Sequence, residues 1–369
     1  MAQIPVPSPT PPKLVSGALK SDDHNLDVLR AIAVLSVFIH HLRPVFGGSN
    51  VLMEILGGLG RTGVVLFFVH TSLVLMESLE RLSAGNRHFI WGFYIRRIFR
   101  IYPLAICAII GAMMLRVPAT WEEATKYSAP GIAQILSNLL LVQNITRQQS
   151  ILGPLWSLPL EVQMYVVLPF LFIFFSSTAR WISYMVTAWG LALLSALGVF
   201  YLTGHMNLFA YIPCFLSGVV AYRCRFAQRR WPFFLWPCLI VCLSVLGAAF
   251  YSDQVAAEIH NLAWEWPVAL ILGLSWHRFH EVRSAAVTKA AHWVAKYSYG
   301  IYLWHHIVIF LVFYRLPVMS GVVRALVAIA GTAAASVASF HCVEDPLIRV
   351  GKRVAAFSVR RSNAPPSEA

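Results

Sequence analysis

Ten apolar segments of 16 to 23 residues follow one another along this chain, and they restrict what it can fold into. A helix of about 20 apolar residues matches the hydrocarbon thickness of a bilayer. The segments cover residues 26–43, 60–79, 94–115, 158–176, 181–202, 208–223, 232–251, 262–277, 297–315 and 320–342. In lipid every backbone polar group needs an internal hydrogen-bond partner, so such segments form helices. We therefore expect an all-α polytopic membrane protein, a bundle of about ten transmembrane helices.

Composition supports this fold class. Apolar residues make up 58% of the chain and charged residues only 12%, whereas soluble globular domains average about 25% charged residues. The formal net charge of +13 is typical of nucleic-acid-binding proteins as well. Membrane proteins, however, collect lysine and arginine in their cytoplasmic loops. We therefore expect membrane lipid around the chain and no nucleic-acid partner.

The distribution of basic residues predicts the orientation. An even number of spans puts both termini on one side. If that side is the cytoplasm, 21 of the 29 lysines and arginines fall in inside segments and 7 in outside segments. This asymmetry indicates cytoplasmic termini. We expect a disordered, proline-rich cytoplasmic tail over residues 1–22, a transmembrane domain over 23–350 and a basic cytoplasmic tail over 351–369.

The first apolar segment carries an arginine near one end and two histidines near the other. A charged side chain within a membrane-spanning helix is costly, which makes Arg30 a candidate functional residue. Arg30 and His41 are separated by 11 residues, so they lie within about 20° of the same helix face and roughly 16 Å apart along the axis. His40 is rotated by about 100° from that face. The alternative is that Arg30 extends to the membrane surface and both histidines lie at the opposite interface.

A cluster of arginines begins the third segment. Arg96 and Arg100 lie one helical turn apart, a spacing that suits binding of phosphate oxygens, and Arg97 lies beside them. Pro103 follows and can free backbone groups of the helix. The alternative is that these charges only set the topology of the segment.

Polar residues also open the fourth segment. Glu161 is expected to enter the membrane at about the depth of His41, where a carboxylate can orient an imidazole for general-base catalysis. The alternative is an inert glutamate stabilised by the helix dipole. Polar and aromatic candidates for supporting roles surround it: Trp156, Ser157, Gln163 and Tyr165.

A histidine in the ninth segment is the last candidate site residue. His305 is expected about two turns into the bilayer, either at the site or as a hydrogen-bonded structural group. The six cysteines lie in or beside apolar runs and lack metal-ligand spacing. We therefore expect no metal site.

In their order and spacing, these motifs resemble the membrane acyltransferase-3 family, and the resemblance covers residues 26–350. It rests on Leu26-Asp27 with Arg30 and His41, on 63–69, on 96–97 and 100–103, on 156–158 with Glu161, Gln163 and Tyr165, on 302–305 and on 343–346.

The resemblance implies an O-acyltransferase, an enzyme of the bacterial inner membrane that moves an acyl group from acyl-CoA, most simply acetyl-CoA, to a hydroxyl of a glycan or glycolipid acceptor. It implies a catalytic His41, as general base or transient acyl carrier, and arginines that bind the CoA. Two alternatives stay open at this point. One is an acyltransferase for a small molecule such as a macrolide. The other is a transporter or flippase in which Arg30, His41, Glu161 and His305 line a polar pathway.

Overall fold

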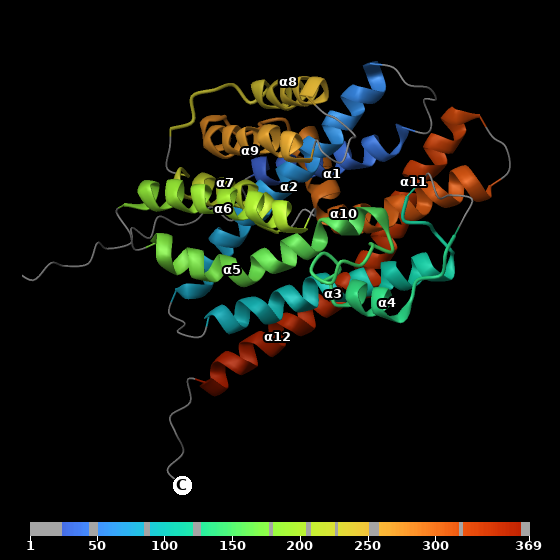
Figure 1. Ribbon diagram of the computed structural model, residues 1–369, viewed down its shortest axis with the longest axis horizontal. Helices are drawn as coiled ribbons and strands as arrows, with labels where there is room; N and C mark the ends of the chain where they lie inside the picture. Colours follow the sequence, from blue (N-terminus) through green and yellow to red (C-terminus); the bar gives the residue numbers. More distant parts are fainter. Residues whose placement is uncertain are drawn as a thin grey trace, which may run out of the picture.

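The computed structural model describes residues 24–43, 51–84, 89–120, 127–176, 180–203, 208–225, 228–250, 258–316 and 320–362. Within these ranges the chain is helical and contains no β-strand. The expected tail over residues 1–22 lies outside the described residues. The all-α fold predicted from the apolar segments is confirmed (Figure 1).

Each of the ten apolar segments overlaps a helix of the described chain. These helices are α1 (His24–His41), α2 (Val51–Ser83), α3 (Phe89–Met114), α5 (Leu158–Ser176), α6 (Trp181–Thr203), α7 (Leu208–Arg223), α8 (Leu235–Phe250), α9 (Glu258–Ser275), α10 (Ala285–Phe310) and α11 (Gly321–Ser339).

Within the described ranges, five helical stretches are long and apolar enough to cross a membrane: Val51–Ser83, Phe89–Met114, Gly153–Phe175, Trp181–Thr203 and Gly321–Phe357. They indicate a membrane protein. Helices α1 and α10, which carry Arg30, His41 and His305, are not among the five. The number of ten spans and the cytoplasmic termini stay predictions.

The chain beyond residue 350 begins as a helix. A short π-helix, η6 (Phe340–Glu344), joins α11 to α12 (Asp345–Ser362), which packs along α3. Another π-helix, η5 (Leu311–Arg315), follows α10. Residues 351–362 thus continue α12, and the division into a transmembrane domain and a basic tail at residue 351 stays a prediction.

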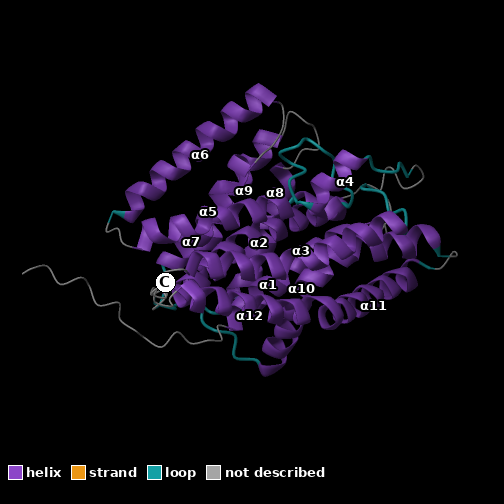
Figure 2. Cartoon of the chain, turned by 90° about the horizontal axis from the view of Figure 1, so that it is seen from below, coloured by secondary structure: helices purple, strands orange, loops and turns teal. Residues whose placement is uncertain are grey.

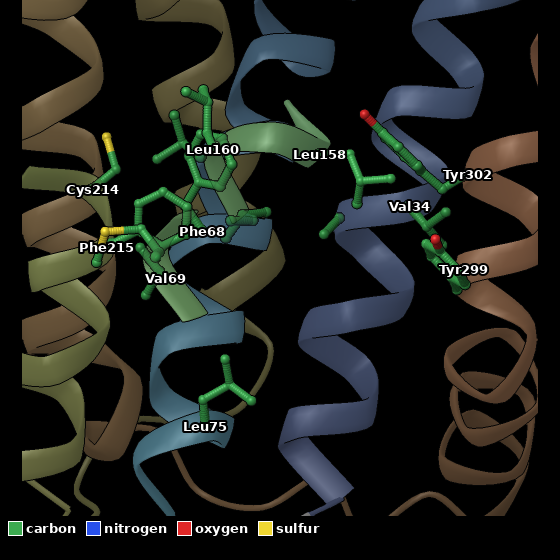
Figure 3. Packing of buried hydrophobic residues seen from close by; sticks show 14 of the residues in the cluster. Val34, Phe68, Val69, Leu75, Leu158, Leu160, Cys214, Phe215, Tyr299 and Tyr302 are labelled. Atoms are coloured by element: carbon green, nitrogen blue, oxygen red, sulfur yellow. The ribbon is translucent and has the colours of Figure 1, made fainter. Parts of the chain in front are cut away.

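Helix α1 lies at the centre of the bundle, between α2 and α10 (Figure 3). The approach of α2 to α1 depends on Gly63, where an added Cβ would lie 2.8 Å from the Ala33 carbonyl oxygen. Small residues allow such close contacts between membrane helices. α2 in turn packs against α7, α8 and α9, and α6 lies at the periphery against α7 (Figure 2). Most of α1 is thus covered by α2 and α10, while Leu35 and Ile39 stay exposed on one side of the helix.

The connection between α3 and α5 re-enters the protein. It contains the short helix α4 (Ile132–Leu139) and the 3-10 helix η2 (Gly153–Trp156). Leu152, Pro154 and Leu155 are buried. α5 consequently begins inside the bundle and not at its surface, which changes the depth at which its first residues lie.

Candidate active site

Two cavities adjoin along α1. The first has a volume of about 200 Å³ and is lined by His41. The second has a volume of about 70 Å³ and is lined by Arg30. Phe68 of α2 and Tyr302 of α10 line both cavities, and we call these two shared rings the partition. The polar face of α1 that the sequence predicted therefore borders one cavity at each end.

His41 is held from two directions. Its Nδ1 lies 2.9 Å from the Val37 carbonyl oxygen and 3.3 Å from Nε2 of His305. Nδ1 of His305 lies 3.0 Å from the Ile301 carbonyl oxygen. Carbonyl oxygens only accept hydrogen bonds, so in the neutral rings both Nδ1 atoms carry the proton. His41 then donates from Nδ1 to Val37 and His305, and its Nε2 keeps an unprotonated lone pair.

His40 lines the same cavity but has a different hydrogen-bond pattern. Its Nδ1 lies 3.1 Å from the Leu56 carbonyl oxygen, and its Nε2 lies 3.3 Å from Nη2 of Arg43. Arginine is always a donor, so Nε2 of His40 accepts from it. Both ring nitrogens of His40 are therefore engaged, whereas His41 has a lone pair available for chemistry.

Three arginines meet in the second cavity: Arg30 from α1 with Arg97 and Arg100 from α3. Nε of Arg30 donates to the Ser298 hydroxyl of α10 at 2.5 Å. Glu161 is the one carboxylate among the residues that line this cavity, so the cavity has a net positive charge. Such a cavity suits a polyanion.

Two of the three arginines of α3 line the cavity, and they are not the pair that the helical spacing favoured. Arg97 and Arg100 line the cavity and Arg96 does not. Arg100 is also paired with Glu344 of η6, with Nη1 3.5 Å from Oε1, and the Glu344 side chain is fully buried. The π-helix between α11 and α12 thus supplies a carboxylate that holds Arg100.

Glu161 does not orient His41. Its Oε1 accepts hydrogen bonds from the hydroxyls of Tyr165 and Thr71, the latter at 3.2 Å, and its side chain lines the arginine cavity. The physical reason is that α5 begins inside the bundle, so that Glu161 lines the arginine cavity and not the cavity of His41. The carbonyl of Val37 and the imidazole of His305 occupy the positions that we expected the carboxylate to fill.

The supporting residues fall into three groups. Ser157 lines the arginine cavity and hydrogen-bonds the Tyr302 hydroxyl at 2.8 Å, and Tyr302 also donates to the Pro154 carbonyl. Trp156 lines the His41 cavity. Gln163 lies in neither lining and instead exchanges hydrogen bonds with Asn144 at 2.8 and 3.2 Å, which ties the preceding connection to α5.

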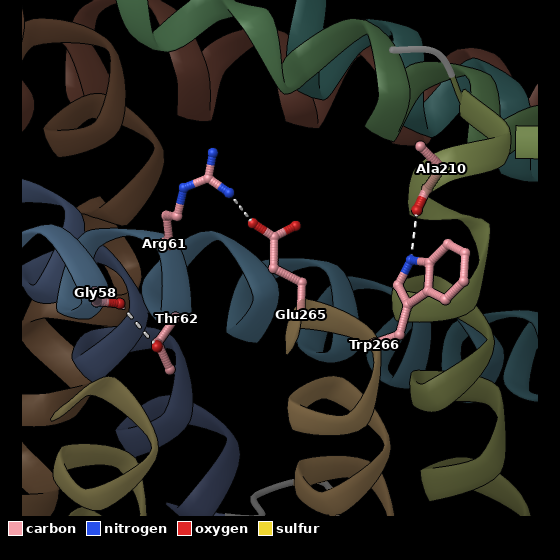
Figure 4. Close-up of polar contacts among 6 residues, drawn as sticks. All are labelled: Gly58, Arg61, Thr62, Ala210, Glu265 and Trp266. Carbon is pink, nitrogen blue, oxygen red and sulfur yellow. Dashed lines mark hydrogen bonds and ion pairs between the residues drawn. The ribbon is translucent and has the colours of Figure 1, made fainter. Parts of the chain in front are cut away.

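One polar pair beside His41 was missed from the sequence. Arg61 of α2 and Glu265 of α9 form an ion pair at the wall of the His41 cavity (Figure 4). Glu265 is an acidic residue within the apolar segment 262–277, the same signal that singled out Arg30. Arg61 is the second residue of the apolar segment 60–79, and it was counted with the outside charges at the end of that segment, so it was not singled out.

Comparison with known proteins places these features in a family. The acyltransferase domain family model matches residues 23–341. YrhL of Bacillus subtilis is 27% identical over 322 residues, which are 78% of this chain and 48% of that protein. The peptidoglycan O-acetyltransferase OatA of Listeria monocytogenes is 27% identical over 365 residues, 89% of this chain and 56% of that protein.

A more distant relative has the same coverage pattern. The O-acetyltransferase OatA of Staphylococcus aureus is 21% identical over 368 residues, 92% of this chain and 59% of that protein. The chain thus spans between about half and three fifths of the length of these relatives. No solved structure matches the chain significantly.

Proposed function

Because the chain belongs to the membrane acyltransferase-3 family, we propose that it is a membrane O-acetyltransferase that moves the acetyl group of acetyl-CoA to a hydroxyl of a peptidoglycan-type glycan. The observation that carries the proposal is the lone pair on Nε2 of His41, which the hydrogen bonds of Nδ1 leave unprotonated, on a residue that lines a cavity next to the arginine cavity. The acceptor class is taken from the relatives that are named peptidoglycan O-acetyltransferases.

The arginine cavity supports acetyl-CoA as the donor. The phosphates of CoA are polyanionic, and guanidinium groups form paired, charge-assisted hydrogen bonds with phosphate oxygens. Arg97 and Arg100 with Arg30 supply three such groups. The pantetheine arm would then extend along α1 and bring the thioester to the partition at Tyr302, next to His41.

The chemistry assigned to His41 is general-base catalysis. Nε2 takes the proton from the acceptor hydroxyl while the hydroxyl oxygen attacks the thioester carbonyl carbon. The C–S bond breaks, and the departing CoA thiolate recovers the proton from the imidazolium. The products are an O-acetyl ester and CoA. Nucleophilic attack by Nε2 on the thioester, with an acetyl-imidazole that then transfers to the hydroxyl, uses the same lone pair.

The basic residues support an arrangement in which the donor and the acceptor approach from opposite sides. With 21 of 29 basic residues in inside segments, the arginine cavity faces the cytoplasm, where acetyl-CoA is made, and the His41 cavity faces outward. The bilayer assigned to this enzyme is the bacterial inner membrane.

A reconstituted system tests the proposal. Purified protein in proteoliposomes receives acetyl-labelled CoA on one side and soluble peptidoglycan fragments on the other. We expect base-labile acetate on the glycan, and slow hydrolysis of acetyl-CoA when the glycan is omitted. Absence of both acetyl-CoA hydrolysis and glycan acetylation in protein that retains its fold contradicts the proposal. Transfer only when both substrates are on the same side contradicts the transmembrane arrangement alone.

A further inference from the structure

We propose that the Arg61–Glu265 ion pair, together with the rings of Trp156 and Tyr211, forms a binding subsite for a pyranose unit of the acceptor. The inference rests on the proposed function and assigns the acceptor side of the same site. The side chains come from α2, α9, η2 and α7, yet all of them line the cavity that contains His41.

The ion pair is placed where a ligand can reach it. The Glu265 side chain is 8% exposed and the Arg61 side chain 37%. Beyond the pair lies a further cavity of about 20 Å³, lined by Asn261, Trp264 and both charged residues. Open space therefore borders the pair on two sides.

Desolvation makes such a pair a costly way to join two helices. Burying a carboxylate such as that of Glu265 can cost as much as its attraction to an arginine returns, and apolar residues of similar size hold helices together at least as well. The pair does offer what a sugar requires. Carboxylate oxygens accept hydrogen bonds from hydroxyl groups, and guanidinium N–H groups donate to hydroxyl oxygens.

Glu265 is held in position by its neighbour in the chain. Nε1 of Trp266 donates to the Ala210 carbonyl oxygen at 2.6 Å and ties α9 to α7 (Figure 4). Tyr211 directly follows Ala210, so the same contact fixes the carboxylate and one aromatic ring relative to each other. A site built in advance loses less entropy when it binds its ligand.

The aromatic rings supply the apolar part of the subsite. The rings of Trp156 and Tyr211 lie 5.6 Å apart between centroids with their planes inclined by 52°. Trp156 remains 42% exposed although it lines the cavity. A pyranose has apolar C–H faces and polar hydroxyl edges. The rings and the ion pair line the same cavity and offer partners for both surfaces, and His41 lies in that cavity to meet the hydroxyl that reacts.

Steady-state kinetics of the reconstituted full-length enzyme test the subsite. The probe is a tetrasaccharide of alternating N-acetylglucosamine and N-acetylmuramic acid, with acetyl-CoA as the donor. Loss of one charge-assisted hydrogen bond weakens binding about tenfold or more. We expect Glu265→Gln and Trp156→Leu each to raise the ratio of the KM for the tetrasaccharide to the KM for acetyl-CoA about tenfold. The matched control is Glu80→Gln, which breaks the ion pair between Arg225 and Glu80. That pair is partly buried, its atoms lie 2.8 Å apart, and neither residue lines one of the two cavities. Glu80→Gln should leave that ratio unchanged.

A charge-swapped variant separates sugar binding from support of the helices. Arg61→Glu combined with Glu265→Arg keeps the attraction between α2 and α9 but exchanges the donor and acceptor positions. We expect the swapped variant to be as abundant in the membrane as the wild type, while its KM ratio stays raised. Recovery of the KM ratio in the swapped variant, or no change of it in Glu265→Gln, overturns the subsite and leaves the proposed function intact. A wild-type enzyme that hydrolyses acetyl-CoA but never acetylates the tetrasaccharide overturns both the subsite and the peptidoglycan acceptor.

Discussion

Nε2 of His305 lies 3.3 Å from Nδ1 of His41, so two imidazoles from α10 and α1 contact each other inside the bundle. His305 is buried and His41 is half-buried. The Val37 carbonyl oxygen places the proton of His41 on Nδ1, and Nε2 of His305 accepts from the same N–H. The contact therefore links a residue distant in the sequence to the atom that we assign to catalysis.

His41→Ala is expected to abolish acetyl transfer, because it removes the Nε2 lone pair. His40→Ala is expected to retain most of the activity, since both ring nitrogens of His40 are engaged by Leu56 and Arg43. Transfer of labelled acetyl groups to glycan, measured at equal membrane abundance, separates the two variants. Equal losses in both would refute the assignment of His41 as the base.

His305→Leu is expected to lower kcat about fivefold and leave the KM for acetyl-CoA unchanged. The reason is loss of one hydrogen bond that orients His41, worth roughly 1 kcal/mol. His305→Gln, whose amide oxygen can accept the same bond, should recover part of the loss. If the glutamine variant is as slow as the leucine variant, His305 does not act through that hydrogen bond.

Arg97→Ala and Arg100→Ala are expected to raise the KM for acetyl-CoA by about ten- to a hundredfold each, because each removes charge-assisted hydrogen bonds to phosphate of roughly 1.5–3 kcal/mol. Arg96→Ala is the matched control, since Arg96 belongs to the same cluster but does not line the cavity. The measurement is initial rate against acetyl-CoA concentration. Equal increases in all three variants would argue for a general effect of charge on topology.

Glu344→Gln is expected to raise the KM for acetyl-CoA less than Arg100→Ala does, because it weakens the support of Arg100 without removing the guanidinium. The double variant should then bind acetyl-CoA no more weakly than Arg100→Ala alone, as residues that act as a unit are not additive. A double-mutant cycle on the KM measures this coupling. Strict additivity would show that Glu344 acts elsewhere.

Hydropathy predicted the presence of the helices better than the residues at which they begin and end. α7 matches the expected segment 208–223, whereas α10 begins at Ala285, twelve residues before the segment that starts at 297. Its first turns contain Lys289 and His292 and carry no apolar run. Ser284 accepts a hydrogen bond from the backbone N–H of Val287 as an N-cap, which is the local signal for this start. The sequence analysis did not predict α12 either, because its many basic residues are typical of a polar tail.

The part of the candidate site that lies on a single helix could be predicted from the sequence. The helical period placed Arg30 and His41 on one face, and each lines one of the two adjoining cavities. Contacts between helices were not predictable. The depth of Glu161 depends on a connection that folds back into the bundle, and the pairing of Arg61 with Glu265 joins residues 204 positions apart. The helical periodicity of one segment gives no information on the depth of Glu161 or on the pairing of Arg61 with Glu265.

Phe68 and Tyr302 separate two polar cavities that lie end to end in the bundle. An unbroken column of water through a membrane protein conducts protons and would discharge the proton-motive force. Apolar constrictions block such a column because water does not fill them. Under the proposed transfer of acetyl groups across the bilayer, the rings of Phe68 and Tyr302 would interrupt such a column and let the membrane stay energised.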